Sequence, residues 1–183
     1  MTTKSTHDLI RRGSPLWITL TALLMGMNII LSMSVFSIPV PGGHLYFCDA
    51  IINIAAVLLD PLAAFFVGGV GSFLGDAFFY PAPMFVSLVA HGLQALVVSL
   101  ISHHVLPDRR VLSSSLGMTV GAIIMTIGYT IGRAWVYATP EVAIAKLPWE
   151  ILQGAFGVVV AIILLYPAGL EKSFHRVLHG GKG

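Results

Sequence analysis

The segment at residues 47–80, FCDAIINIAAVLLDPLAAFFVGGVGSFLGDAFFY, decides how this chain is folded. It is apolar and glycine-rich, and Asp60-Pro61 interrupts it near the middle as a turn signal. Read as one broken span, the segment gives the chain five membrane crossings, whereas two short spans give six. The flanking sequence decides between these counts, because it fixes on which side of a membrane the positive charges lie.

The composition of the chain indicates an integral membrane protein. Of its 183 residues, 56% are hydrophobic and only 10% are charged, and the mean hydropathy is +0.89. An ordinary soluble domain carries about 25% charged residues, so a soluble fold could not cover this much apolar surface. The net charge of +2 comes from Lys and Arg in short loops and tails, which argues against nucleic-acid binding. The single cysteine, Cys48, excludes an internal disulfide.

Outward from the central segment, four further apolar runs are long enough to cross a bilayer as helices. The six expected spans are residues 16–38, 48–59, 62–79, 84–105, 116–137 and 147–166. The first has a basic flank but is too long for the apolar part of a signal peptide, so we expect it to be retained.

The positive-inside rule favours six spans over five. With six, both termini share a side that holds eight of the basic residues: Lys4, Arg11, Arg12, Arg109, Arg110, Lys172, Arg176 and Lys182. The other side then holds only Lys146, whereas five spans divide these residues four against five. We therefore predict an all-α integral membrane protein, with six transmembrane helices in one compact bundle and cytoplasmic N and C termini. Residues 1–183 form a single membrane domain, with tails at 1–15 and 168–183 around a bundle at 16–167, and the second span is tilted or reaches only half-depth.

Polar and ionisable side chains are concentrated in the outer halves of five spans, while the inner halves are nearly bare. A charge inside a bilayer costs roughly 2.5–3.5 kcal/mol, so such residues usually face the protein interior and mark a site. They predict a polar pocket that opens outward, is roofed by the loop at residues 39–47, and is closed beneath by apolar packing. The candidate binding residues are His44, Tyr46, Asp49, Asp76, Tyr80, His91, Gln94, Tyr129, Arg133, Trp149, Glu150 and Gln153.

Several of these residues have a second interpretation that the sequence leaves open. Asp49 and Glu150 can be interfacial charges that face water. Asp76 can pair with Arg133, and His91 can make a hydrogen bond between helices. The sequence alone does not choose between these roles and ligand contact.

Small residues four apart recur along the spans, a spacing that lets helix backbones approach closely. The pairs are Ala22 and Gly26, Gly71 and Gly75, Gly117 and Gly121, and Gly128 and Gly132. We expect most of them to pack inside the bundle. The first helix has little polar content and precedes the roof loop, so Ala22 and Gly26 are candidates for docking another membrane protein.

Motifs for nucleotide, metal or nucleophilic chemistry are absent from the sequence. It has no P-loop and no H-E-x-x-H motif, and Gly71-Ser72 lacks the glycines of a nucleophile elbow. We therefore expect no cofactor and no metal. Two other classes stay open: a membrane-embedded enzyme that uses His91, Asp76 and Glu150, and a stand-alone solute facilitator, which the bare inner halves disfavour.

Four segments carry a resemblance to a known family. They are TALLMGMN at residues 21–28, GGHLYFCDA at 42–50, LDPLAA at 59–64 leading into GGVGSFLGD at 68–76, and YPAPMF at 80–85. In this order and spacing, the chain resembles the substrate-binding S components of energy-coupling factor (ECF) vitamin transporters, of the riboflavin type and its relatives, over residues 16–167. The docking pattern A-x-x-x-A of that family is replaced here by Ala22-x-x-x-Gly26.

The resemblance implies a mechanism and partners rather than an enzymatic activity. An S component of a prokaryotic plasma membrane captures a water-soluble vitamin or precursor, closes the loop over it, and topples in the bilayer to deliver it. ATP hydrolysis in two ATP-binding cassette proteins drives this delivery, through a transmembrane coupling protein. Pantothenate, pyridoxine, hydroxymethylpyrimidine, riboflavin and cobalamin all remain candidate ligands.

Overall fold

Three helices begin at a polar residue followed directly by proline, which fixes where the chain enters the bundle. In the computed structural model, which describes residues 10–33 and 36–179, these are α1 (Pro15–Leu31), α3 (Pro61–Phe65) and α7 (Pro140–Leu165). The capping side chains of Ser14, Asp60 and Thr139 accept a hydrogen bond from the backbone of the first helical turn. Proline is favoured just after such a cap, where its missing N–H costs no hydrogen bond. Asp60 is therefore a helix cap and more than a simple turn.

The central segment forms two helical pieces, as the six-span interpretation predicts. The first is α2 (Cys48–Leu58), and the second runs without a break through α3, the π-helical turn η2 (Phe66–Val70) and α4 (Gly71–Phe79). Glycines at η2 bring this second piece close to the next helix. A Cβ on Gly68 would lie 2.8 Å from both the Cβ of Ala95 and the carbonyl oxygen of His91.

The remaining helices are α5 (Met84–His104), α6 (Arg110–Gly132) with its π-helical extension η3 (Arg133–Tyr137), α7 and α8 (Leu170–His179). Among the described residues, four helical stretches are long and apolar enough to cross a membrane: Pro61–Phe79, Met84–His104, Arg110–Tyr137 and Pro140–Leu165. Two shorter apolar helices, Pro15–Leu31 and Cys48–Leu58, accompany them.

Three predicted helix boundaries are wrong. The first helix ends at Leu31 rather than residue 38, because Ile38 already belongs to a strand. The fifth span begins at Arg110 and the sixth at Pro140, six and seven residues earlier than predicted, because their polar first turns still form helix. Trp149, Glu150 and Gln153 consequently lie well inside α7 instead of opening it.

The predicted roof loop contains a β-hairpin, formed by β1 (Ile38–Val40) and β2 (Gly43–Leu45). The strands are antiparallel, with Ile38 opposite Leu45 and Val40 opposite Gly43. Gly42 at the turn has a φ of +80°, a backbone conformation that side chains other than glycine rarely adopt. The hairpin is therefore a tight turn fixed by glycine, and it is the one departure from an all-helical fold in the described residues.

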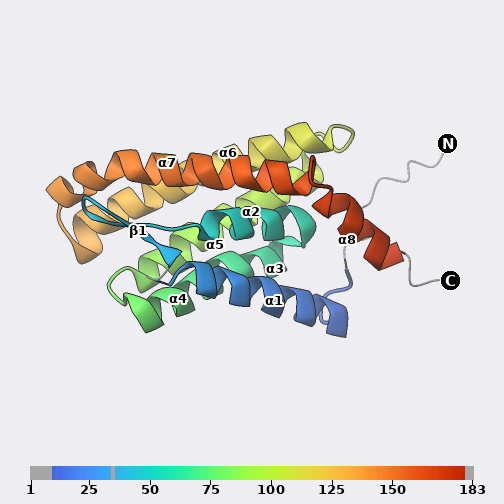
Figure 1. Ribbon diagram of the computed structural model, residues 1–183, viewed down its shortest axis with the longest axis horizontal. Helices are drawn as coiled ribbons and strands as arrows, with labels where there is room; N and C mark the ends of the chain where they lie inside the picture. Colours follow the sequence, from blue (N-terminus) through green and yellow to red (C-terminus); the bar gives the residue numbers. More distant parts are fainter. Residues whose placement is uncertain (1–9, 34–35, 180–183) are drawn as a thin grey trace.

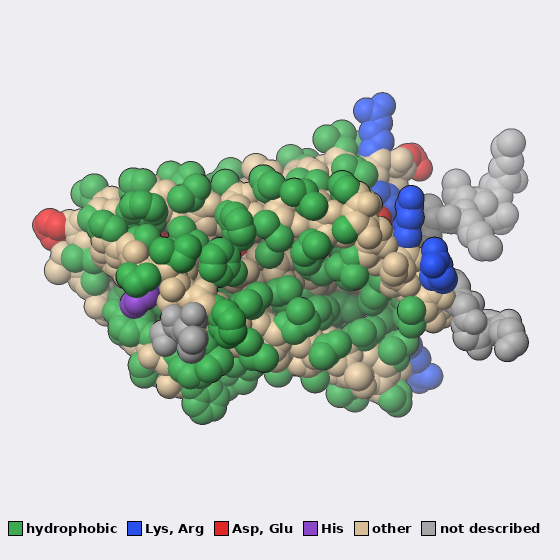
Figure 2. Space-filling view, viewed as in Figure 1, with side chains coloured by type: hydrophobic (Ala, Val, Ile, Leu, Met, Phe, Trp, Pro, Cys, Tyr) green, Lys and Arg blue, Asp and Glu red, His purple; other side chains and the backbone are tan. Residues whose placement is uncertain are grey.

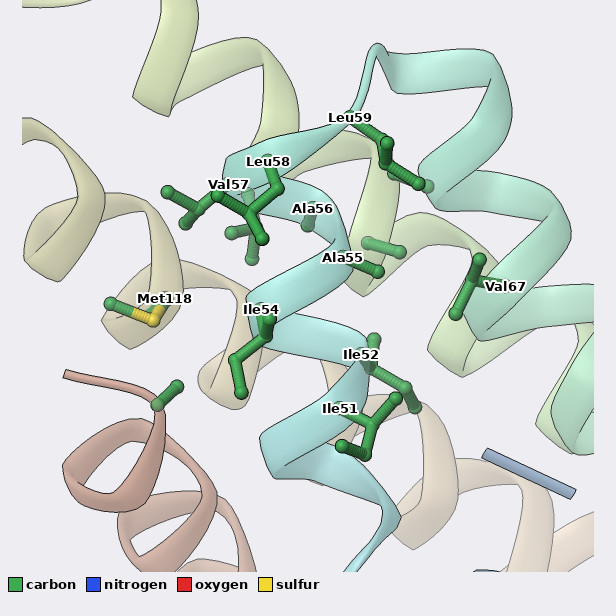
Figure 3. Close-up of a cluster of buried hydrophobic side chains, with 14 of the residues drawn as sticks. Ile51, Ile52, Ile54, Ala55, Ala56, Val57, Leu58, Leu59, Val67 and Met118 are labelled. Atoms are coloured by element: carbon green, nitrogen blue, oxygen red, sulfur yellow. The ribbon is translucent and has the colours of Figure 1, made fainter. Parts of the chain in front are cut away.

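The core is built around α2, whose eleven residues are all buried (Figure 3). Ile52, Ala55 and Val57 lie in one apolar cluster with residues of the surrounding helices, among them Met118 and Leu165. The α2 helix packs against α1, α3, α5 and α7, and Figure 1 shows it running between α1 and α7. This cluster is the apolar packing that was predicted beneath the pocket.

The three glycine pairs, one on α4 and two on α6, pack inside the bundle, as predicted for most of the small-residue pairs. A Cβ on Gly71 would lie 2.7 Å from Asn28 of α1, and one on Gly75 would lie 2.9 Å from Ser32. The pairs on α6 lie against α5, where a Cβ on Gly128 would come within 2.9 Å of Ala90.

The two ends of the bundle differ in charge. Figure 2 shows Lys and Arg side chains gathered at the end where α8 and the start of α1 lie, while the hairpin lies toward the opposite end (Figure 1). Ion pairs tie the basic end together, with Arg12 at 2.8 Å from Asp60 and Arg110 at 3.0 Å from Glu171. The described chain thus begins and ends at the basic end.

Candidate functional site

A polar cavity of about 40 Å³ lies beneath the hairpin, lined by residues of β2, α2, α4, α5, α6, η3 and α7 and of their connections. Nine of the predicted site residues line it: His44, Tyr46, Asp76, Tyr80, His91, Tyr129, Arg133, Glu150 and Gln153. Ser32, Gly42, Gly43, Cys48, Ser72, Pro83 and Tyr137 complete the wall. The structure therefore brings together residues that lie more than 100 positions apart in the sequence.

The wall formed by η3 and α7 carries an ion pair. Nη1 of Arg133 lies 2.7 Å from Oε1 of Glu150, and the guanidinium stacks over the ring of Tyr137, 5.6 Å from its centroid. Lys146, one turn before Glu150, places its Nζ 3.9 Å from the same carboxylate oxygen. Arg133 thus pairs with Glu150 rather than with Asp76, the partner that the sequence left open.

The opposite wall holds Asp76 in a chain of hydroxyl groups. The Ser87 hydroxyl donates to Oδ2 of Asp76 and also contacts the Tyr129 hydroxyl. The ring of Tyr129 packs edge-on against His91, with 5.2 Å between centroids. Asp76, Ser87 and His91 are all buried, so this wall is a positioned polar surface rather than a set of solvated side chains.

Asp49 and Gln94 lie behind the cavity, where they join three helices. Oδ1 of Asp49 accepts a hydrogen bond from Nε2 of Gln94 at 2.9 Å, and Oδ2 accepts one from Nε2 of Gln153 at 2.7 Å. Nδ1 of His91 lies 2.7 Å from Oε1 of Gln94 and 3.9 Å from Asp49. Asp49 is therefore an interior hub of this network and not an interfacial charge.

The hairpin is held against one face of α7 by three contacts. Nζ of Lys146 donates to the carbonyl oxygen of His44 at 2.6 Å, and the backbone N–H of Tyr46 donates to Oε1 of Gln153 at 2.9 Å. Gly42 packs closely enough that a Cβ would lie 3.1 Å from the Cβ of Lys146. Burial raises the pKa of the Tyr46 phenol above its ordinary value, so this side chain stays a neutral hydroxyl.

Sequence reasoning missed Tyr137 in the lining and also Lys146 and Ser87, which bind residues that line the cavity. Lys146 was assigned to the outer surface, yet it is 1% exposed and binds the hairpin. Its spacing of four from Glu150 was the available signal, because residues so spaced share a helix face. No sequence pattern distinguished Ser87 from the other serines of its helix. Trp149 is half-buried and is not among the residues that line the cavity.

The two candidate docking residues lie on an open face of α1. Ala22 is exposed, and a Cβ on Gly26 would meet no atom within 4 Å. Gly26 thus differs from the glycines of α4 and α6 described above, which lie against other helices of the bundle.

The three residues of the enzyme hypothesis are bound to different partners: His91 to Gln94, Asp76 to Ser87 and Glu150 to Arg133. Within the described residues, the carboxylate within 4 Å of His91 is that of Asp49, and no group of three His, Cys, Asp or Glu is placed to hold a metal ion.

A family model matches most of the chain, and two further comparisons show a similar sequence and a similar fold. The model of the family described as "ECF-type riboflavin transporter, S component" matches residues 14–172. An uncharacterized protein in the gap 3′ region of Pyrococcus woesei is 36% identical over 125 residues, which cover 67% of this chain and 82% of that protein. A solved S component of a bacterial ECF transporter has the same fold, with a TM-score of 0.69 at 22% identity, over 85% of this chain and 96% of that one. Because the family model spans most of the chain, we conclude that this protein belongs to the S component family of ECF-type riboflavin transporters.

Proposed function

We propose that this chain captures a water-soluble vitamin or vitamin precursor outside the cell and passes it to an ATP-driven ECF module. The observation that carries the proposal is the polar cavity beneath a hairpin held on α7, with the apolar α2 cluster beneath it. A binding chamber closed at its inner end suits capture, whereas a facilitator needs a path through the bundle.

We propose six membrane crossings, with both termini on the cytoplasmic side of a prokaryotic plasma membrane. The four long apolar helices and the two shorter ones, α1 and α2, supply the six. The gathering of Lys and Arg at the end opposite the hairpin supports this orientation, because cytoplasmic ends carry the excess of positive charge (Figure 2). The cavity then faces outward.

Ligand entry requires the hairpin to move away from α7. A cavity of about 40 Å³ is far smaller than the roughly 300–1,000 Å³ of a typical small-molecule site, so it has to widen before it can hold a vitamin. Opening breaks the hydrogen bonds of Lys146 to His44 and of Tyr46 to Gln153, and closing over a ligand restores them. The small volume favours pantothenate, pyridoxine, hydroxymethylpyrimidine or riboflavin over the much larger cobalamin.

Delivery requires partners, and we propose the open face of α1 as the docking surface for the transmembrane coupling protein. Ala22 and Gly26 leave room there for a neighbouring helix to approach closely. Two ATP-binding cassette ATPases complete the module, and the chain itself supplies no catalytic group to the transport cycle.

Mass spectrometry of the small molecules released when the purified protein is denatured tests this proposal. We expect one vitamin-like compound in near-stoichiometric amount, and isothermal titration of the emptied protein should then show that this compound binds again. A haem, a quinone or a lipid product in its place contradicts vitamin capture. Solute flux through the chain alone in liposomes, without ATPases, would favour a facilitator, and turnover of a lipid or peptide would favour an enzyme.

A further inference from the structure

Arg133 and Lys146, which lie at or near the cavity, already contact other groups of the protein. Arg133 is paired with Glu150 at 2.7 Å and stacked on Tyr137. Lys146 donates to the hairpin and lies 3.9 Å from the same Glu150 oxygen. One carboxylate thus faces two positive charges, and each cation has a further protein contact, Arg133 with the ring of Tyr137 and Lys146 with the carbonyl oxygen of His44.

The carboxylate of Asp49 is also balanced. Two glutamine amides donate to it, and the ring of His91 lies 3.9 Å away. It lies behind the cavity and is not one of the lining residues. His91 also lines the cavity, and its Nδ1 is directed toward Gln94 and Asp49.

Asp76 differs from Glu150 and Asp49, because it lines the cavity and has no ion-pair partner among the described residues. Within the described residues, no Lys, Arg or His nitrogen lies within 4.0 Å of its carboxylate, and its hydrogen bond comes from the neutral hydroxyl of Ser87. The side chain is 7% exposed. A buried carboxylate without a countercharge is costly, and a ligand that supplies the countercharge recovers that cost on binding.

The groups beside Asp76 are aromatic. Tyr80, Tyr129 and Tyr137 line the cavity together with Tyr46 from the hairpin side. Tyrosine faces attract both flat rings and cations, since the π-system is negative on its face. Four tyrosines thus line the cavity together with Asp76, a composition that suits an aromatic ligand.

Given the proposed capture function, on which this inference rests, we propose that the ligand is a small aromatic ring carrying a positive charge, as an amino substituent or a protonated ring nitrogen, and that this group binds Asp76. An anionic ligand would bring a second negative charge next to Asp76, and among the described residues the nearby Arg133 and Lys146 already contact Glu150. We therefore expect cationic ring compounds to bind more tightly than neutral and acidic ones of similar size.

A charge series on the unaltered protein tests the inference first. Pyridoxamine, pyridoxine and 4-pyridoxic acid share one ring and differ in a cationic, neutral or anionic substituent. Hydroxymethylpyrimidine and its 4-oxo analogue form a second matched set, and riboflavin and pantothenate serve as larger neutral and anionic probes. In isothermal titration we expect the tightest ligand to be the cationic or amino-bearing member of its set, and pyridoxic acid and pantothenate to bind least.

The Asp76→Asn variant tests the assigned partner. Losing one member of a buried charge pair costs about 2–5 kcal/mol, so affinity for the cationic ligand should fall by about 30-fold or more, and discrimination against the neutral analogue should shrink. Asp60→Asn is the matched control, because Asp60 is a buried carboxylate at the start of α3 and does not line the cavity. This variant should retain wild-type affinity.

The outcomes separate this inference from the function on which it rests. A tightest ligand that is neutral or anionic, or a cationic ligand that binds Asp76→Asn and wild type equally, overturns the inference and leaves vitamin capture standing. Failure of every compound to bind a protein that also releases no vitamin on denaturation overturns both.

Discussion

Replacing Asp49 with Asn should weaken ligand binding although Asp49 does not line the cavity. The carboxylate accepts from Gln94 at 2.9 Å and from Gln153 at 2.7 Å, and an asparagine presents one oxygen and one NH₂ group in the same positions. One glutamine then faces a donor instead of an acceptor. If Gln153 turns its amide to adapt, it loses the hydrogen bond from Tyr46 that holds the hairpin, and if Gln94 turns, it loses its contact with His91.

The size of the effect follows from the number of bonds that Asp49→Asn disrupts. Turning Gln153 leaves the backbone N–H of Tyr46 without an acceptor, which costs about 1–3 kcal/mol. Where closure of the hairpin and ligand binding are coupled, that cost lowers affinity by about 5- to 150-fold. Isothermal titration with the compound recovered from the purified protein measures the affinity, and thermal unfolding in the same detergent measures the stability.

The control variant is Asp60→Asn, at the opposite end of α2. Asp60 also accepts three hydrogen bonds, from Arg12, Trp17 and Ala63, but it lies at the basic end of the bundle. We expect the Asp60→Asn substitution to lower the melting temperature and to leave the ligand affinity unchanged. Wild-type affinity in Asp49→Asn, or an equal loss of affinity in both variants, would refute the idea that the network positions the hairpin.

Three further substitutions follow from the described contacts. Gly26→Leu fills the open face of α1, so uptake in cells that contain the ECF module should stop while ligand binding to the isolated chain is retained, and normal uptake would place the docking surface elsewhere. Glu150→Ala leaves the Arg133 guanidinium buried without its carboxylate, which should reduce stability by about 3–5 kcal/mol and weaken ligand binding; an unchanged melting temperature would contradict this. Asn53→Leu removes a buried amide that has no hydrogen-bond partner within the described residues, so the melting temperature should stay equal or rise, and a clear fall would reveal a partner for that amide.

The sequence was informative where a single physical pattern dominates. Asp60-Pro61 breaks an apolar run, and the resulting division of the central segment into two helical pieces is present in the structure. Polar residues in apolar helices are costly enough that they indicate a site, and most of the predicted ones do line one cavity. The glycine spacings likewise predicted close helix contacts.

The sequence was less informative about which side chains meet. Arg133 had several carboxylates within plausible reach, and its choice of Glu150 over Asp76 depends on the turn of η3 and on the direction in which α7 presents Glu150. Lys146 looked like a surface charge because the polar first turn of α7 was interpreted as loop. The β-hairpin has only three residues in each strand, too few for an alternating pattern to stand out.

The short, fully enclosed α2 has a consequence for how the protein is made. Eleven residues span about 16 Å as a helix, roughly half the hydrocarbon thickness of a bilayer. During synthesis, α2 is therefore too short to cross the membrane by itself, and we expect it to insert together with the helix at Pro61–Phe79, as a pair of antiparallel helices. Its final burial requires α5 and α7, so the ligand chamber is completed only after the last long helix has been inserted.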